Sequence, residues 1–563
     1  MSLPTAAQWP QLLFAGDPGI SKWFDAGPAQ ISVRAAVRSR SGFPPLTPDE
    51  LNDWRSWLEP LQPPAEALAG LEKLARPGTV AVVTGQQAGL LGGPLYTLYK
   101  AAGAIAWAHA IERETGIPAV PVFWVASDDH DFAEVATARW LDRERRLRSW
   151  SAPSPAAGPG RSVSRVQLTP AMVADLSRAI RDALPGAPQL DELLHFVHSS
   201  ADTTWEDQFT RLLLRTLGPL GLVPVAPRLG WLRRRAIAVI RSDIEGGTRF
   251  SGLLAESAQA LAIVGVGDRA IHRNGNEANW FLEIGGIRGK ATWHDDRCRV
   301  THPATGESLL EASPQDLLAR LEETPEAFSP NAALRPLVQD AALPTAAYVA
   351  GPSELIYHAQ IGPLYAETGI FRPALIPRPG AVLIEPPVRR AAQRLGLEIE
   401  EAYASGPEAI ARAASRHGDE FQAQNAVRKE FETIREALAR AGATIDGAGR
   451  DTAIHQAYGR LLTAFDGRAE QLTGRLANYF AQQAGHGERW HDTLVHSLWP
   501  DGSRQERHLG WINLLAQWGM QAPVHIAQAL AHNTATLQLL DLAELPGLRT
   551  ESQPAPAPPC SAP

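Results

Sequence analysis

An early segment of the chain constrains the fold most, because two apolar runs flank a glycine-rich turn and a helical pattern. Thr79–Thr84 (TVAVVT) is rich in β-branched residues, which is typical of a buried parallel strand. The turn Gly85–Gly93 follows, and Pro94 then opens a helical pattern over Leu95–Arg113. Ala119–Ala126 (AVPVFWVA) is the second apolar run. This order predicts the βαβ unit of a parallel sheet, and therefore an α/β fold.

Later segments fit the same sheet. Ala346–Gly351 and Ala374–Pro377 lie on either side of a helical stretch, Ser353–Gly369, which favours a second crossover that returns to the first sheet. Further expectations are a helix over Thr204–Leu217, strands over Leu222–Val225 and Leu261–Val266, and a small hairpin within Asn274–Lys290.

From about Val388 the pattern becomes helical, with apolar residues at near-heptad spacing. They are Phe421, Val427, Phe431, Ile434 and Leu438 in a first run, and Ile454, Tyr458, Leu461, Phe465, Leu472, Leu476 and Tyr479 in a second. With a turn over Gly442–Gly449, these runs predict an antiparallel coiled-coil hairpin, and a seam of this length favours a homodimer arm. The final segment, Gln553–Pro563, has the composition of a disordered tail.

These patterns divide the 563 residues into four expected parts. They are a core over 1–386 with inserted segments near 150–220 and 265–330, a helical coiled coil over 387–490, a segment over 491–545 that packs back on the core, and a tail over 546–563.

Composition excludes several classes of function. The net charge is −8, so the chain lacks the basic footprint of a nucleic-acid-binding protein. No apolar run approaches the roughly 18 residues that a membrane helix needs. Cys298 and Cys560 are the only cysteines, too few for a disulfide framework or a zinc–thiolate site. With no basic leader before an apolar core at the N-terminus, we expect a cytoplasmic protein.

The first candidate site is the segment GQQAGLLGGPLYTLYK. Glycines let a backbone approach a ligand, and a helix that starts near Pro94 offers free amides to an anion. Tyr96, Thr97 and Lys100 share one helical face by their spacing. The alternative is a glycine turn that only packs a helix on a sheet. The candidate binding residues here are Gly85, Gln86, Gln87, Gly92, Gly93, Tyr96 and Thr97, with Lys100 as a catalytic candidate.

The second candidate is Ser127–Asp131 (SDDHD), which follows the second predicted strand. Ligands of open α/β sheets bind beyond the carboxyl ends of the strands. Three carboxylates and an imidazole could hold Mg²⁺, orient an amine or act as a base. Asp129 and His130 are therefore catalytic candidates, and Asp128 and Asp131 binding candidates. Helix capping is the alternative, and it would account for one aspartate.

The third candidate lies in Ala350–Arg378. Tyr357 and Gln360 are three residues apart on a predicted helix, and Arg378 follows a predicted strand end, where it could bind a carboxylate or a phosphate. Ordinary exposed arginine is the alternative in so arginine-rich a chain.

Four runs together resemble the bacillithiol biosynthesis cysteine-adding enzymes. They are GQQAGLLGGPLYTLYK, PVFWVASDDHDFAEV, SPNAALRP (Ser329–Pro336) and LPTAAYVAGPSELIYHAQIGPLY, with a weaker match at Gln505-Glu506-Arg507. The resemblance implies a Rossmann-like core similar to that of class I aminoacyl-tRNA synthetases, connecting insertions and a dimerising coiled coil. It places the turn Gly85–Pro94 at the HIGH position and Pro377–Gly380 at the KMSKS-like loop, although neither motif appears literally.

The resemblance also implies the reaction. L-cysteine would be joined to the amino group of glucosaminyl malate in the last step of bacillithiol synthesis. Since a carboxylate is a poor electrophile, ATP or another nucleotide would activate it, with Mg²⁺ as a further candidate cofactor. From their positions in the sequence, and not from the resemblance, we expect Gly92–Thr97 and Lys100 to contact phosphates and Asp129 or His130 to act near the attacking amine. No cysteine cluster matches the zinc–thiolate pocket of the related mycothiol ligase.

Two other interpretations stay open from the sequence. One is a different nucleotide-dependent α/β ligase or nucleotidyltransferase that acts on another acid and amine. The other is a non-enzymatic dimeric ligand-binding protein, against which the adjacent carboxylates of Ser127–Asp131 argue, because a scaffold need not bear their repulsion.

Overall fold

A computed structural model of the chain describes residues 7–24, 29–154, 160–267, 270–271, 274–414, 419–448, 452–483, 486–530 and 537–548. These residues form two compact units. The first contains the described parts of Met1–Arg143, Arg148–Leu383 and Glu506–Pro563, and the second contains Glu144–Leu147 and Ile384–Gln505.

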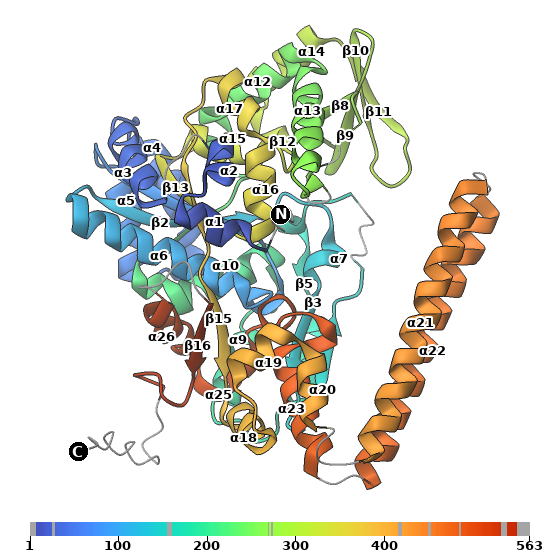
Figure 1. Cartoon of the computed structure of the whole chain (residues 1–563). Coiled ribbons are helices and arrows are strands. Elements are labelled where there is room, and N and C mark those ends of the chain that lie inside the picture. The colour runs from blue at the N-terminus through green and yellow to red at the C-terminus, as the bar shows by residue number, and fades with distance from the viewer. Residues whose placement is uncertain are drawn as a thin grey trace. The chain divides into compact units, whose positions relative to one another are not determined.

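A five-stranded parallel sheet lies at the centre of the first unit (Figure 1). Its strands stand in the order β14 (Ala374–Pro377), β13 (Thr345–Ala350), β1 (Val80–Gln87), β2 (Ala119–Ala126) and β7 (Val223–Val225). Each neighbouring pair is parallel. The α/β class and the predicted strands of the two crossovers are therefore confirmed, although β1 runs through Gln87 rather than ending before the turn.

Alternating side chains of β1 serve the two faces of this sheet. Val80 and Val82 pack in one cluster with α3 (Ala29–Arg40) and α6 (Tyr96–Thr115), whereas Ala81 and Val83 belong to the cluster that includes Trp54 and Leu71. Both faces are thus covered by helices, as a parallel sheet requires. The helix α6 begins after Leu95, so Pro94 precedes its N-cap instead of occupying the first helical position.

The first unit contains further helices, which come before, between and after the sheet strands in the sequence. They are α1 (Trp9–Ala15), α2 (Pro18–Ser21), α4 (Pro48–Leu58), α5 (Ala65–Leu74), α7 (Phe132–Val135), α8 (Pro170–Ala183), α9 (Leu190–His198), α10 (Trp205–Leu217), α11 (Gly230–Arg235), α12 (Ile237–Gly246), α13 (Arg249–Ile263), α14 (Pro314–Glu323), α15 (Arg335–Ala342), α16 (Pro352–Gln360), α17 (Gly362–Thr368), α25 (Ile512–Trp518) and α26 (Ala522–Ala529). Short strands are β3 (Thr137–Leu141), β4 (Leu147–Ser151), β5 (Gln167–Leu168), β6 (Thr203–Thr204), β15 (Gly380–Ile384) and β16 (Leu537–Asp541). The helix predicted over Thr204–Leu217 is confirmed, with Thr204 as its N-cap.

A second, antiparallel sheet is inserted between β7 and β13. Its order is β11 (Ser308–Ala312), β10 (Arg297–Thr301), β9 (Ile287–His294), β8 (Glu277–Ile284) and β12 (Phe328–Pro330) (Figure 1). Gly285 and Gly286 connect β8 to β9 with φ values of 58° and 81°, the left-handed backbone that a two-residue hairpin turn needs. The predicted hairpin is confirmed.

The strand predicted over Leu261–Val266 is wrong, because α13 continues to Ile263. Phe250, Leu254 and Leu261 are buried on one face of this helix, whereas Ile263 is 78% exposed at its end. A short apolar run does not by itself distinguish a strand from the end of an amphipathic helix.

The second unit consists of helices. They are α18 (Pro386–Leu395), α19 (Ile399–Ser405), α20 (Pro407–Ala414), α21 (Asp419–Ala448), α22 (Thr452–Gln483) and α23 (His486–Leu498), and α24 (Gln505–His508) starts at its end. The long helices α21 and α22 lie side by side (Figure 1). Phe431 and Phe465 meet edge to face with ring centroids 6.2 Å apart.

The predicted turn at Gly442–Gly449 is wrong, since α21 continues to Ala448. Gly442 lies against the ring of Tyr458, where a Cβ would collide, and the Tyr458 hydroxyl donates to the Leu438 carbonyl at 2.6 Å. Glycine therefore serves close packing between the helices here, not a turn. The side chains of Phe421, Leu476 and Tyr479, the residue Cys560 and the predicted tail Gln553–Pro563 lie outside the described residues. Among the described helices, none has the length and apolar character that a membrane crossing requires.

Candidate active site

A cavity of about 600 Å³ opens at the carboxyl ends of β1, β2 and β13, where ligands of open α/β sheets bind. Its charged and polar lining comes from distant parts of the first unit. That lining is Gln86, Gln87, Tyr96, Lys100, Asp128, Asp129, His130, Glu134, Arg288, Asn331, Arg335, Ser353, Glu354, Tyr357, Arg378 and Arg507.

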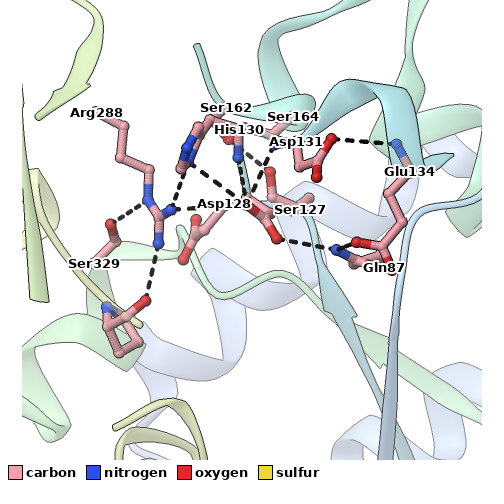
Figure 2. A network of polar contacts seen from close by, with 12 residues as sticks. Gln87, Ser127, Asp128, His130, Asp131, Glu134, Ser162, Ser164, Arg288 and Ser329 are labelled. Carbon is pink, nitrogen blue, oxygen red and sulfur yellow. Dashed lines mark hydrogen bonds and ion pairs between the residues drawn. The ribbon is translucent and has the colours of Figure 1, made fainter. Parts of the chain in front are cut away.

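A carboxylate cluster lines one side of this cavity (Figure 2). The Gln87 amide donates to Asp129 Oδ2 at 3.0 Å and to Glu134 Oε2 at 2.8 Å, so one side chain joins both carboxylates. Burial alone would raise the pKa of Asp129, but Arg288, Gln87 and a backbone amide outweigh it and lower that pKa. Burial, with the nearby aspartates, raises the pKa of Glu134. The two neighbouring carboxylates therefore differ in acidity.

Asp129 also shapes its own loop. Its Oδ1 accepts the backbone amides of His130 at 2.7 Å and Asp131 at 3.3 Å. Asp128 forms an ion pair with the buried Arg233, and Asp131 caps α7 by accepting from the Glu134 amide. Capping thus accounts for Asp131, as the alternative interpretation of the motif proposed, but it does not account for Asp129.

Arg288 from β9 reaches this loop from the inserted sheet. It donates to Ser329 Oγ at 2.9 Å and to the Pro330 carbonyl at 2.9 Å, and its Nη1 lies 3.1 Å from His130 Nδ1 (Figure 2). Burial lowers the pKa of Arg288 to about 10, and burial and the Arg288 charge lower the pKa of His130. His130 is accordingly neutral at pH 7.

A buried network stands on another side of the cavity. The Lys100 ammonium pairs with Glu354 Oε2 at 2.7 Å and donates to the Gly85 carbonyl. Glu354 Oε1 accepts from the hydroxyls of Tyr348 at 2.9 Å and Tyr357 at 3.2 Å. Burial lowers the pKa of Lys100. Burial alone would raise the pKa of Glu354, but Lys100, the Gly351 amide and Arg335 outweigh it and lower that pKa.

Three arginines make the remaining side of the cavity cationic. Arg335 donates to the Tyr357 hydroxyl at 2.9 Å. Arg378 lies 3.5 Å from Glu506 Oε1, and its guanidinium carbon is 5.8 Å from the centre of the Tyr96 ring. Arg507 also lines the cavity. Guanidinium groups are the side chains best suited to bind carboxylate or phosphate in two-point contacts.

The cavity brings together ten of the residues that the sequence singled out. They are Gly85, Gln86, Gln87, Tyr96, Lys100, Asp128, Asp129, His130, Tyr357 and Arg378. Gly92, Gly93, Thr97, Asp131 and Gln360 are not among the residues that line it.

The expected anion site at the start of α6 needs correction. The amides of Gly92, Gly93 and Thr97 donate to the carbonyls of Gly89, Leu90 and Pro94, and that of Leu95 donates to Leu509, so none of these four is free for a phosphate. Gly92, at φ 92°, faces the ring of Trp511. Gln360 is also buried elsewhere, where its amide donates to the carbonyls of Leu254 and Ile271.

Sequence reasoning missed Glu134, Arg288, Arg335, Glu354 and Arg507 as site residues. Two signals could have found some of them. The runs SPNAALRP and QER contain Arg335 and Arg507, and both are charged residues within short motifs shared with a family. Arg288 carries no local signal, because it sits in an ordinary β-hairpin.

Within the part of the chain that the structure describes, no group of three or more His, Cys, Asp or Glu side chains could hold a metal ion. Cys298, on β10, is a free buried thiol, and burial raises its pKa to about 12. That thiol is poorly suited to bind a metal or attack a substrate, because both require the thiolate.

Comparison with known proteins decides the family. The profile described as "Bacillithiol biosynthesis BshC, N-terminal Rossmann-like domain" matches residues 55–379. The chain belongs to the BshC family.

Relatives of this BshC chain match over much of its length. A protein of Solibacter usitatus named "Putative cysteine ligase BshC" is 30% identical over 470 residues, which cover 82% of this chain and 84% of the relative. A protein of Salinibacter ruber with the same name is 35% identical over 340 residues, 59% of each chain. Among solved structures, Mycobacterium tuberculosis methionyl-tRNA synthetase with methionyl-adenylate covers 81% of this chain and 97% of its own, at 10% identity and a TM-score of 0.23.

Proposed function

We propose that this BshC chain is a ligase that joins the carboxylate of L-cysteine to the amino group of glucosaminyl malate, the last step of bacillithiol synthesis. One observation carries the proposal. A single cavity is lined both by carboxylates, which include Asp129 and Glu134, and by guanidinium groups, which include Arg378 and Arg507. An amide-forming site needs both, because it must hold an amine and an anion together. The relatives named as cysteine ligases support this reaction class.

The acidic side of the cavity suits the amine. An attacking amine must be neutral, so the ammonium form first gives one proton to solvent, and the nitrogen loses a second proton when it bonds to the carbonyl carbon. The lowered pKa of Asp129 keeps this carboxylate ionised, so it can hold the ammonium form and steer it. Glu134, whose pKa is raised, is the better acceptor of the departing proton, and Gln87 holds the two carboxylates together.

The cationic side suits an anionic substrate or a nucleotide. Arg378 and Arg507 together offer donors for phosphate oxygens, and the aromatic ring of Tyr96 lies beside Arg378. This donor set fits ATP or another nucleotide, which would supply activation of the cysteine carboxylate as a mixed anhydride. The described residues offer no cluster for a resident Mg²⁺, and we assign no step to that ion.

We propose for Lys100 a role other than the phosphate contact that its position in the sequence indicated. The Lys100 side chain is 2% exposed, and its ammonium pairs with Glu354. We propose that Lys100 and Glu354 fix the shape of the cavity wall, including Tyr357, rather than contact a phosphate.

We further propose a homodimer that forms through α21 and α22 and acts in the cytoplasm. Ile434, Ile454, Leu461 and Leu472 support the dimer, because these side chains on the two helices are between 43% and 53% exposed. Apolar side chains that are repeatedly exposed along a long helix pair favour a partner surface.

The purified protein, incubated with ATP, L-cysteine and glucosaminyl malate, should form the cysteinyl amide with loss of one water, measured by mass spectrometry. Release of AMP and pyrophosphate would show an adenylate route, and ADP with phosphate an acyl-phosphate route. In a deletion strain, glucosaminyl malate should accumulate while bacillithiol disappears. Unchanged thiols in that strain would overturn the proposal, and product from another acid and amine would support a different ligase.

A further inference from the structure

We infer that Arg288 is a positioning residue that holds His130 in the tautomer protonated at Nε2, so that His130 donates a hydrogen bond to a substrate oxygen instead of serving as the base. The substrate part of this inference rests on the proposed function, whereas the tautomer does not.

The guanidinium of Arg288 is held on several sides. Its Nε and Nη2 donate to Ser329 and Pro330, each at 2.9 Å. Its carbon lies 3.7 Å from the centre of the Phe281 ring, so the cation also stacks on an aromatic face. With the Arg288 side chain 8% exposed, its Nη1 is directed at His130 Nδ1, 3.1 Å away (Figure 2).

This contact decides which imidazole nitrogen carries the proton. A guanidinium has five N–H donors and no acceptor, so a nitrogen that faces it at hydrogen-bond distance must present a lone pair. His130 Nδ1 is therefore unprotonated, and in the neutral ring the proton is on Nε2.

Asp129 does not compete for a proton at Nδ1. Its Oδ1 lies 3.6 Å from His130 Nδ1, beyond hydrogen-bond distance, and already accepts the amides of His130 and Asp131. Its Oδ2 accepts from Gln87. In many sites a carboxylate accepts a hydrogen bond from Nδ1–H of a histidine. Here the Arg288 cation donates to His130 Nδ1, which favours the tautomer that is protonated at Nε2.

The groups around the ring act on the His130 charge in opposite directions. Asp129 and Asp131 on its own loop favour the charged form, and Arg288 from β9 opposes it. From β8, Phe281 contributes an aromatic ring with its centroid 5.8 Å from that of the imidazole. Burial and Arg288 together prevail and lower the pKa of His130.

It follows that His130 and the carboxylates of the cavity have different roles: His130 donates a hydrogen bond, and the carboxylates accept the proton. His130 lines the cavity, and its Nε2 has no hydrogen-bond partner among the described residues. An Nε2–H that cannot accept a proton suits a carboxylate or carbonyl oxygen, on which negative charge grows as the amine attacks. The proton from the amine then goes to the Asp129 and Glu134 pair.

The tautomer is tested by ¹⁵N–¹H correlation NMR of the histidine rings, without any substrate. His130→Gln identifies the His130 signals by their loss. The wild type should show the Nε2–H pattern at neutral pH. Arg288→Met should give a mixture of tautomers with a higher His130 pKa, and Arg288→Lys should restore the wild-type pattern in part. Arg165→Met, which removes an arginine paired with Glu283 of the same hairpin, is the matched control and should change nothing.

The donor role is tested by kinetics. His130→Gln keeps an N–H near the Nε2 position and should stay within about tenfold of wild-type kcat, whereas His130→Ala should lose roughly 100-fold. The acidic limb of the pH–rate profile should survive in His130→Gln. Loss of that limb, with His130→Gln as slow as His130→Ala, would overturn the donor role. An Nδ1–H tautomer or a protonated ring in the wild type at neutral pH would overturn the role of Arg288. Absence of ligase activity would refute the proposed function alone, since the NMR result stands apart from it.

Discussion

The Lys100 ammonium lies 2.7 Å from Glu354 Oε2, and it joins the first helix after β1 to the first helix after β13. The side chain of Lys100 is 2% exposed and that of Glu354 19%. Loss of one partner from such a pair leaves a buried charge uncompensated, whereas loss of both does not.

Lys100→Met should therefore destabilise the fold by about 3–5 kcal/mol, through the uncompensated Glu354 carboxylate. The double variant Lys100→Met, Glu354→Gln should recover much of that loss. Urea unfolding of the wild type, both single variants and the double variant completes the cycle. Equal stability of Lys100→Met and wild type would show that the lysine is not a structural partner of Glu354.

Asp129→Asn should lower kcat more than it raises KM, because the amide keeps the loop contacts of Oδ1 but loses the charge that steers the amine. The matched control is Asp131→Asn, which changes the cap of α7 outside the cavity and should be nearly silent, since asparagine caps as well as aspartate. Steady-state kinetics of both variants decide the matter. Equal effects of the two substitutions would reduce Asp129 to a loop-forming residue.

Asp340 should make stability depend on pH in the acid range. Burial raises its pKa from 3.8 to about 6, against the hydrogen bonds from Tyr365 and Gln339. Because the folded-state value is the higher one, the folded protein holds this proton more tightly than the unfolded chain. The contribution of Asp340 to the free energy of unfolding therefore falls by roughly 3 kcal/mol as the pH rises from about 4 to 6.

Asp340→Asn should remove that slope. Its amide can donate to the Tyr365 hydroxyl, which accepts as well as donates. Urea unfolding of both proteins across this pH range gives the difference directly, and parallel curves would contradict the assignment.

The proposed dimer predicts that Ile434→Glu together with Leu461→Glu gives a monomer by light scattering, because charges would replace exposed apolar side chains on α21 and α22. Phe431 is not the residue for this test. It packs against Phe465 within the same helix pair, so its loss should disturb the hairpin itself. A dimer that persists in the double variant, with helicity unchanged in circular dichroism, would place the interface elsewhere.

The strands β1 and β2 could be predicted because a strand that is buried on both faces of a sheet has an uninterrupted apolar sequence. Glycines are harder to interpret. In the sequence, a glycine that lets a ligand approach cannot be distinguished from one that makes room for a side chain. Gly92 makes room for the Trp511 ring, and Gly442 makes room for Tyr458. From the sequence pattern alone, we predicted a phosphate site at Gly92 and a turn at Gly442.

Asp128 and Asp129 could be predicted as site residues because they follow β2 directly. Arg378 could also be predicted, because it follows a strand end of the same sheet, whereas Arg288, Arg335 and Arg507 were missed, since each reaches the cavity from a different part of the chain. Arg288 comes from the inserted sheet and Arg507 from α24. Only tertiary packing selects Arg288 from the many arginines of the sequence.

The late position of Arg507 has a consequence for the order in which the protein becomes competent during its synthesis. All strands of the parallel sheet have been translated once residue 377 is made, but Arg507 and Glu506, the partner of Arg378, follow about 130 residues later (507 − 377 = 130). A ribosome-bound chain can therefore carry the whole sheet while one wall of its cavity is still missing. Such a chain should not consume ATP or cysteine until Arg507 has been translated and has joined the cavity lining.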